Sequence, residues 1–172
     1  MVREYGGWVL SLLLVTAGST AGRSPLSESG APQVVVDVTA MKEVVARDEA
    51  GRERVELREA SATGPGDTLV YRISYTNKGT SPAHDAKVTD PIPAGTVLLP
   101  GSWEAPGADF AVSVDGGRSW DSYPVRHTVK HADGSTSLEE VDATAYTHVR
   151  WTSRESLAPG TTRSAVFKVK VR

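Results

Sequence analysis

Cysteine is absent from the 172-residue chain, and this absence removes several options at once. The fold cannot be held by disulfide bonds, so the burial of apolar side chains has to supply its stability. A lipid anchor attached to cysteine is excluded for the same reason. A zinc site would also lack thiolate ligands, so it would depend on histidine and carboxylate groups alone.

Net charge is also low. The 19 basic and 21 acidic residues give a formal charge of -2, and the pI is about 6.1. Nucleic-acid binding needs a basic surface, so we expect no nucleic acid among the partners. The length is that of one ordinary domain with its own core.

Long hydrophobic runs are missing as well. The apolar stretch from Trp8 to Ala17 is shorter than the roughly 20 residues that a membrane-spanning helix needs. It follows a basic residue and precedes small residues, an order typical of a secretory signal. The sequence therefore predicts a signal peptide over residues 1–21, cleaved after Ala21 or, alternatively, after Ser19. A buried N-terminal strand or helix is the competing interpretation.

The segment after the predicted signal is rich in Ser, Gly and Pro, so residues 22–32 are expected to form a flexible lead. No later stretch is apolar for long enough to anchor the chain. We therefore expect an exported protein, periplasmic or extracellular, with no membrane span in its mature form.

Strict alternation of apolar and polar residues marks two segments. Leu69, Tyr71 and Ile73 share one side of the first segment, and Phe167 and Val169 share one side of the last. A period of two with one polar face is typical of half-buried antiparallel strands. These five side chains are expected to point into the core.

The rest of the chain contains short apolar segments separated by Gly, Pro and Asn. Strands are expected at 33–45, 54–58, 86–89, 96–99, 110–114, 125–129 and 146–152, besides the alternating segments at 69–77 and 161–172. The first two would pair as an N-terminal β-hairpin, although Glu, Arg and Ala leave a helix over 41–59 open. Eight or nine short strands of this kind indicate an all-β protein, an antiparallel β-sandwich.

Four blocks of residues, in this order, resemble a known family. They are Gly66-Asp67-x-Leu69-x-Tyr71-x-Ile73-x-Tyr75-x-Asn77-x-Gly79, then Ala83 to Asp90, then Ile92-Pro93-Ala94-Gly95, then Leu157-Ala158-Pro159-Gly160. Together they are similar to the bacterial conserved repeat domain, domain-of-unknown-function family eleven, over roughly residues 60–172.

This resemblance implies an immunoglobulin-like β-sandwich over residues 33–172, located outside the cytoplasm, and no catalytic residues. Members of the family often occur in tandem arrays on large cell-surface proteins. The present sequence carries one copy, together with the N-terminal hairpin and an insert over 103–142.

Residues 113–120, Ser-Val-Asp-Gly-Gly-Arg-Ser-Trp, fit the Asp-box pattern of the hairpin turns in sialidase propeller blades. Asp115 can accept hydrogen bonds from the backbone of such a turn, and Gly116 and Gly117 permit positive φ. Trp120 would pack beneath the turn. We expect a structural turn rather than a glycan contact.

No catalytic, cofactor or metal site is predicted. No serine lies in a Gly-x-Ser-x-Gly elbow, and no segment has the spacing of an EF-hand loop. His127 and His131 would lie about 13 Å apart on one face of a strand, too far for one ion to bridge. We therefore expect that the protein is not an enzyme and needs no cofactor.

Three aromatic residues in loops of the insert, Trp103, Trp120 and Tyr123, are the candidate ligand contacts. The alternative is that they fasten the insert to the core. The sequence thus indicates a monomeric, non-catalytic structural or adhesion module of the bacterial cell envelope, whose partner is an envelope protein or polymer. A glycan- or polymer-binding module that uses its aromatic loops is the alternative function.

Overall fold

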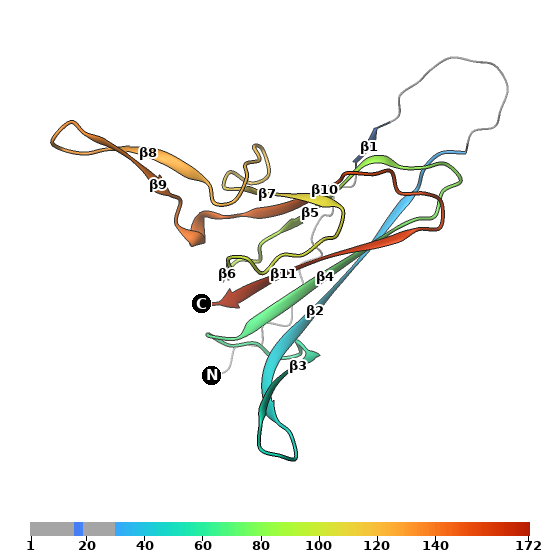
Figure 1. Cartoon of the computed structure of the whole chain (residues 1–172), viewed down its shortest axis with the longest axis horizontal. Helices are drawn as coiled ribbons and strands as arrows, with labels where there is room; N and C mark the ends of the chain where they lie inside the picture. The colour runs from blue at the N-terminus through green and yellow to red at the C-terminus, as the bar shows by residue number, and fades with distance from the viewer. Residues whose placement is uncertain (1–15, 19–29) are drawn as a thin grey trace.

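The computed structural model describes residues 16–18 and 30–172 (Figure 1). The predicted signal peptide and flexible lead therefore lie outside the described residues, except at 16–18 and 30–32. The elements are β1 (Thr16–Gly18), β2 (Val34–Arg47), β3 (Glu53–Glu59), β4 (Thr68–Asn77), β5 (His84–Pro91), β6 (Thr96–Leu98), β7 (Ala108–Ser113), β8 (Arg126–Lys130), β9 (Thr136–Glu140), the 3-10 turn η1 (Ala143–Ala145), β10 (His148–Ser153) and β11 (Thr162–Val171).

Antiparallel strands form two sheets in a sandwich-like arrangement. The larger sheet has the order β3-β2-β4-β11-β6, and the smaller has the order β1-β5-β10-β7. We call these two sheets the body. The β8–β9 hairpin and the far end of the β2–β3 hairpin extend away from it, and we call them the two arms (Figure 1).

The core lies between the two sheets. It combines side chains of β4, β6 and β11 with side chains of β5, β7 and β10. The largest fully buried members are Trp151, Tyr75, Phe167, Ile73, Leu98, Leu157, Val88, Val112, Val149 and Val169. Alternation along each strand produces this division, because successive side chains point to opposite faces of a sheet.

The predicted core residues are confirmed. Leu69, Ile73, Phe167 and Val169 are buried, and the half-buried Tyr71 stacks on Phe167 with 5.1 Å between ring centroids. β4 and β11 are neighbours in the larger sheet, so the two alternating segments pair directly over nine residues.

The N-terminal hairpin is also confirmed, and the helix over 41–59 is not formed. β2 and β3 pair without interruption from Met41 opposite Glu59 to Arg47 opposite Glu53. β-branched valines favour the strand because their side chains are restricted in a helix. β2 is longer than expected and reaches Arg47.

Two strand predictions need correction. β5 continues through Asp90 and Pro91, where the proline was expected to stop it. Pro91 lies beyond the part of β5 that pairs with β1, and the next residue, Ile92, donates to Thr147 O on the β10 side. The nitrogen of Pro91 therefore points to an open edge, where proline is tolerated. β1 and β9 were not predicted as strands; β9 was missed because Leu138 is its one large apolar residue.

Asn77 joins three segments at the end of β4. Its buried side chain accepts hydrogen bonds from the backbone N–H groups of Gln33 (3.2 Å) and Gly79 (3.0 Å). Its amide donates to the carbonyl oxygens of Ser81 (2.7 Å) and Leu157 (2.8 Å). All of these polar atoms would otherwise need water at the closed end of the core.

Candidate functional site

The loop after β7 forms the closed turn that the Asp-box pattern predicts. The carboxylate of Asp115 accepts hydrogen bonds from Ser113 Oγ (2.7 Å), Arg118 N (3.0 Å), Ser119 N (2.9 Å) and Ser119 Oγ (2.7 Å). Val112 and Asp121 close the loop with two backbone hydrogen bonds of 2.9 Å. The donors come from the loop itself, so Asp115 holds the turn.

These donors also determine the protonation of Asp115. The backbone and side chain of Ser119, followed by the hydroxyl of Ser113, hold the pKa of the Asp115 carboxyl well below its usual range. Each bond stabilises the charged form of the carboxyl. Asp115 therefore stays ionised and engaged with the loop at neutral pH.

Trp120 lies on the outer face of the smaller sheet. Its Nε1 donates to Gly117 O at 3.0 Å, and Arg150 Cζ lies 4.2 Å from the centroid of its ring. Arg150 directly precedes the buried Trp151 in β10, so the two side chains point to opposite faces. Trp120 thus covers Arg150, and burial there lowers the pKa of the Arg150 guanidinium.

Trp103 and Tyr123 pack together on the inner side of the same sheet. The Trp103 ring stacks on Phe110, with centroids 4.3 Å apart, and Tyr123 meets the Trp103 ring edge-on at 4.7 Å. Phe110 contacts the core residue Trp151 at 5.4 Å. Trp103 and Tyr123 therefore fasten the insert to the core.

The three predicted ligand contacts thus do not form one surface. Trp103 and Tyr123 reach the inner side of the smaller sheet through Phe110, while Trp120 covers Arg150 on its outer side. Phe110 and Trp151 point to the inner side of the sheet, and Arg150, the neighbour of Trp151 in β10, points to the outer side. One flat aromatic patch made of all three is therefore excluded.

Two open hollows flank Trp103 and Glu104. One has a volume of about 580 Å³ and includes the Glu43–Lys168 ion pair in its lining. The other has a volume of about 540 Å³ and includes the pair between Asp109 and Arg154, whose Nη2 lies 2.7 Å from Asp109 Oδ1. Trp103 is the aromatic residue that both hollows share.

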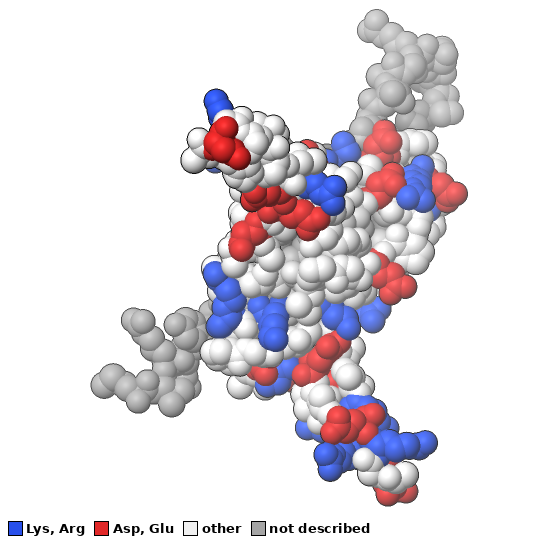
Figure 2. All heavy atoms as spheres, turned by 60° about the vertical axis from the view of Figure 1, so that its left-hand side comes forward, with Lys and Arg blue, Asp and Glu red and all other residues white. Residues whose placement is uncertain are grey.

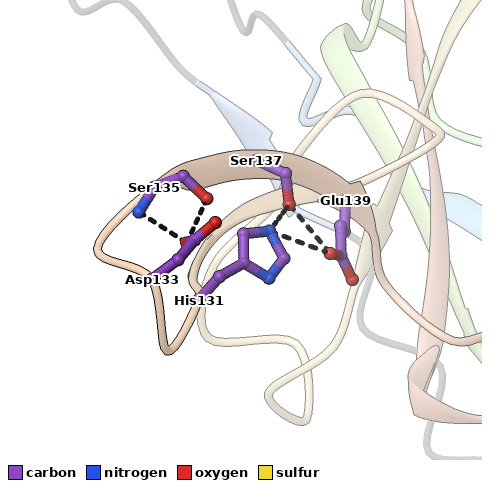
Figure 3. A network of polar contacts seen from close by, with 5 residues as sticks. All are labelled: His131, Asp133, Ser135, Ser137 and Glu139. Atoms are coloured by element: carbon purple, nitrogen blue, oxygen red, sulfur yellow. Dashed lines mark hydrogen bonds and ion pairs between the residues drawn. The ribbon is translucent and has the colours of Figure 1, made fainter.

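The tip of the β8–β9 arm carries the polar network drawn in Figure 3. Ser137 Oγ donates to Glu139 Oε1 at 2.8 Å and lies 2.8 Å from His131 Nε2, while Asp133 accepts from Ser135 N and Oγ. His131 Nε2 and Glu139 Oε1 are 4.0 Å apart. The bonds lie within the turn and connect it to β9, so the network stabilises the tip of the hairpin.

The arms expose apolar side chains that sequence reasoning did not select. Val45, Val55 and Leu57 of the β2–β3 arm are 64%, 62% and 45% exposed, and Leu138 of the β8–β9 arm is 63% exposed. The alternation of Val55 and Leu57 with charged residues resembled an ordinary half-buried strand. Only the register of the strands shows that these residues lie on the face of the larger sheet that points away from the core.

Within residues 16–18 and 30–172, no cluster of three or more His, Cys, Asp or Glu side chains could hold a metal ion. No helix in this part of the chain is long and apolar enough to cross a membrane. Comparison with protein-family models, with curated proteins and with solved structures found no match.

Proposed function

We propose that the chain is an exported, non-catalytic interaction module of the bacterial cell envelope, with a structural or adhesive role and an envelope protein or polymer as its partner. The observation that carries this proposal is the pair of arms. Each extends from the body and presents apolar side chains that the core does not use. Exposed apolar groups on a rigid support are typical of surfaces that bind other molecules.

The proposal includes membership of the bacterial conserved repeat domain family and an immunoglobulin-like sandwich. Four strands of the larger sheet, β2-β4-β11-β6, and three of the smaller, β5-β10-β7, match the four-and-three division of immunoglobulin constant domains. The similarity to those domains lies in the number of strands in each of the two sheets. The closing strand β11 belongs to the larger sheet, whereas in those domains it belongs to the smaller.

The β8–β9 arm offers the direct test. Leu138→Ser should reduce the amount of envelope material that the immobilised mature protein retains, because it removes the exposed apolar group of this arm. Thr128→Ser is the matched control, because Thr128 lies directly opposite Leu138 in the hairpin. Equal retention by both variants and the unaltered protein would contradict the proposal. So would turnover of a glycosidic, ester or peptide substrate that is lost on changing one Asp, Ser or His.

Export has its own test. N-terminal sequencing of the mature protein should find a first residue between Thr20 and Ser24. A protein that retains Met1 and stays in the cytoplasm would contradict the proposed location.

The second candidate function, binding of a glycan or other polymer, is favoured by the two hollows beside Trp103. Each combines an aromatic ring with acidic and basic side chains, the mixture that neutral sugars need for stacking and hydrogen bonding. Addition of a soluble envelope polysaccharide should shift the tryptophan fluorescence of Trp120→Phe, in which Trp103 remains. Arg154→Ala should weaken this response while Arg118→Ala leaves it unchanged, and no response in any variant would contradict this function.

A further inference from the structure

With seven residues, β3 is the longest strand at the outer edge of either sheet of the body, apart from β5, whose outer edge is free once β1 is removed with the proposed signal peptide. β5 contains Pro91 and a residue with positive φ, Asp85, which both hinder pairing at an edge. The outer edge of β7 is bridged by Asp121, and β8 and β9 have five residues each. β6 has three residues, whereas β3 has seven. β3 contains no proline or glycine and pairs with β2 without a bulge, so its backbone is regular. Its charged residues are of both signs, so they oppose pairing with most strands but permit pairing with a strand whose charges are complementary.

The two faces of the β2–β3 arm differ in chemistry. Val45 and Val55 are directly opposite each other, and both are exposed on one face. The other face of β3 carries Arg54, Glu56 and Arg58, with Glu56 paired to both arginines. Figure 2 shows acidic and basic side chains interspersed on this lower projection. An edge of this composition is suited to a strand with apolar residues on one face and alternating charges on the other.

We propose that this strand is β3 of a second copy of the chain, paired antiparallel across a two-fold axis at Val55. The axis stands perpendicular to the sheet, so each residue faces one of the same parity in the partner strand. Val55 then faces the second Val55, and Arg54 faces Glu56 of the other copy, twice. The exposed valines form one apolar row across four strands.

Charge selects this register over its neighbour. An axis at Glu56 would place Glu56 against Glu56 and Arg54 against Arg58, and like charges directly opposite are destabilising. With the axis at Val55, every Arg54 meets a carboxylate, and Arg58 faces Arg52, which is already paired with Asp48. An axis at Leu57 would also oppose Glu56 and Arg58, but it would set Val55 against Glu59 and interrupt the row of valines. The apolar row therefore selects Val55 over Leu57. The pairing would join the two larger sheets edge to edge.

This inference rests on the proposed function, because it takes the arms as contact surfaces and names the partner of one of them. It replaces the monomer expected from the sequence with a dimer. If the dimer is not found, the proposal that the β8–β9 arm binds an envelope partner still stands, because the Leu138→Ser retention assay does not involve β3.

The absence of cysteine makes cross-linking a sharp test. Val55→Cys should form a disulfide-linked dimer under mild oxidation, because the two Cβ atoms would lie about 5 Å apart. Val45→Cys is the matched control, with 64% exposure against 62% for Val55. Its two copies would lie about 14 Å apart, three strand spacings, and should remain unlinked. Equal cross-linking of both variants, or of neither, would overturn the proposal.

A charge exchange tests the ion pairs. Sedimentation of the unaltered mature protein should show a dimer whose population rises with concentration. Arg54→Glu and Glu56→Arg should each raise its dissociation constant by about tenfold or more, because like charges then face each other twice. The double variant restores opposite charges and should recover the original constant. A monomer at every concentration, or a double variant as weak as the single ones, would overturn the proposal.

Discussion

The body and the β2–β3 arm share a strand, yet they use its apolar residues in different ways. Val34 and Val36 of β2 pack against the core, where the smaller sheet covers the larger. Val45, further along the same strand, is 64% exposed. β2 pairs with β4 from Val34 to Lys42, and beyond that point its one neighbour is β3. Val45 also lies on the opposite face of β2 from Val34 and Val36. One face of the strand therefore contributes to the core, and beyond the end of β4 the other face forms a contact surface.

Different forces hold the two regions. Burial of large side chains contributes about 1.5–3 kcal/mol for each residue in the body. The arms are two-stranded ribbons, which are marginal on their own, and their ion pairs are exposed and therefore weak. The body should thus determine the stability of the protein, while the arms can vary without unfolding it.

The largest effect is expected in the centre of the body. Phe167→Ala removes a fully buried ring that contacts both Tyr71 and Trp151. The free energy of unfolding should fall by about 3–5 kcal/mol. Denaturant titration measures it, with the exposed Val55→Ala as the control, expected within about 0.5 kcal/mol. An equal fall in the free energy of unfolding of the two variants would show that the body and the arm contribute alike to stability.

The next effect should come from Asn77. Asn77→Ala removes a fully buried side chain that bonds backbone groups of Gln33, Gly79, Ser81 and Leu157, three of them at part-buried positions. The free energy of unfolding should fall by about 2–4 kcal/mol, because each unsatisfied buried group costs about 1–3 kcal/mol. Thermal unfolding measures the change. A loss as small as that of Lys78→Ala, at the neighbouring exposed position, would show that water replaces these bonds.

A smaller, pH-dependent effect is expected at Asp115. Because its pKa is lower in the folded protein than in the unfolded chain, ionised Asp115 stabilises the fold above the ordinary range near pH 4. This contribution is lost as the pH falls through the folded-state value. Asp115→Ala should therefore lower the melting temperature at pH 7, and the difference from the unaltered protein should shrink steadily below about pH 4. A difference independent of pH would contradict the role of the carboxylate.

The smallest effect is expected from removing the β8–β9 arm. Val141 N donates to Val125 O at 2.9 Å, so these residues already close the base of the hairpin. Replacing residues 126–140 with a short Gly-rich turn should change the melting temperature by only about 2–4 °C, the equivalent of about 1 kcal/mol. Loss of the cooperative transition would show that the arm belongs to the body.

The strands of the body could be predicted because their buried and exposed positions are occupied by apolar and polar residues in alternation. Leu69, Ile73, Phe167 and Val169 alternate with polar residues, and all four are in the core. β9 was missed because a ribbon exposed on both faces has no apolar period to detect. The Asp-box turn could also be predicted from the sequence, and Asp115 makes the expected hydrogen bonds within it.

The candidate site was predicted less well. Trp103, Trp120 and Tyr123 are close in sequence and were grouped as loop aromatics. The structure divides them: Trp103 and Tyr123 pack with Phe110 on the inner side of the smaller sheet, whereas Trp120 lies against Arg150 on its outer side. The exposed valines of the arm were overlooked for the converse reason, since their pattern is identical to that of a buried strand.

Sequence by itself determined the all-β class, the N-terminal hairpin, the alternating core faces and the Asp-box turn, because each depends on residues a few positions apart. Tertiary structure alone decided which apolar residues are covered. Val36 and Val38 lie on the same face of one strand and have the same side chain, but Val36 packs against the core whereas Val38 is 38% exposed. Burial therefore depends on what covers each position. That covering is contributed by segments distant in the chain, and it separates the core from the contact surface.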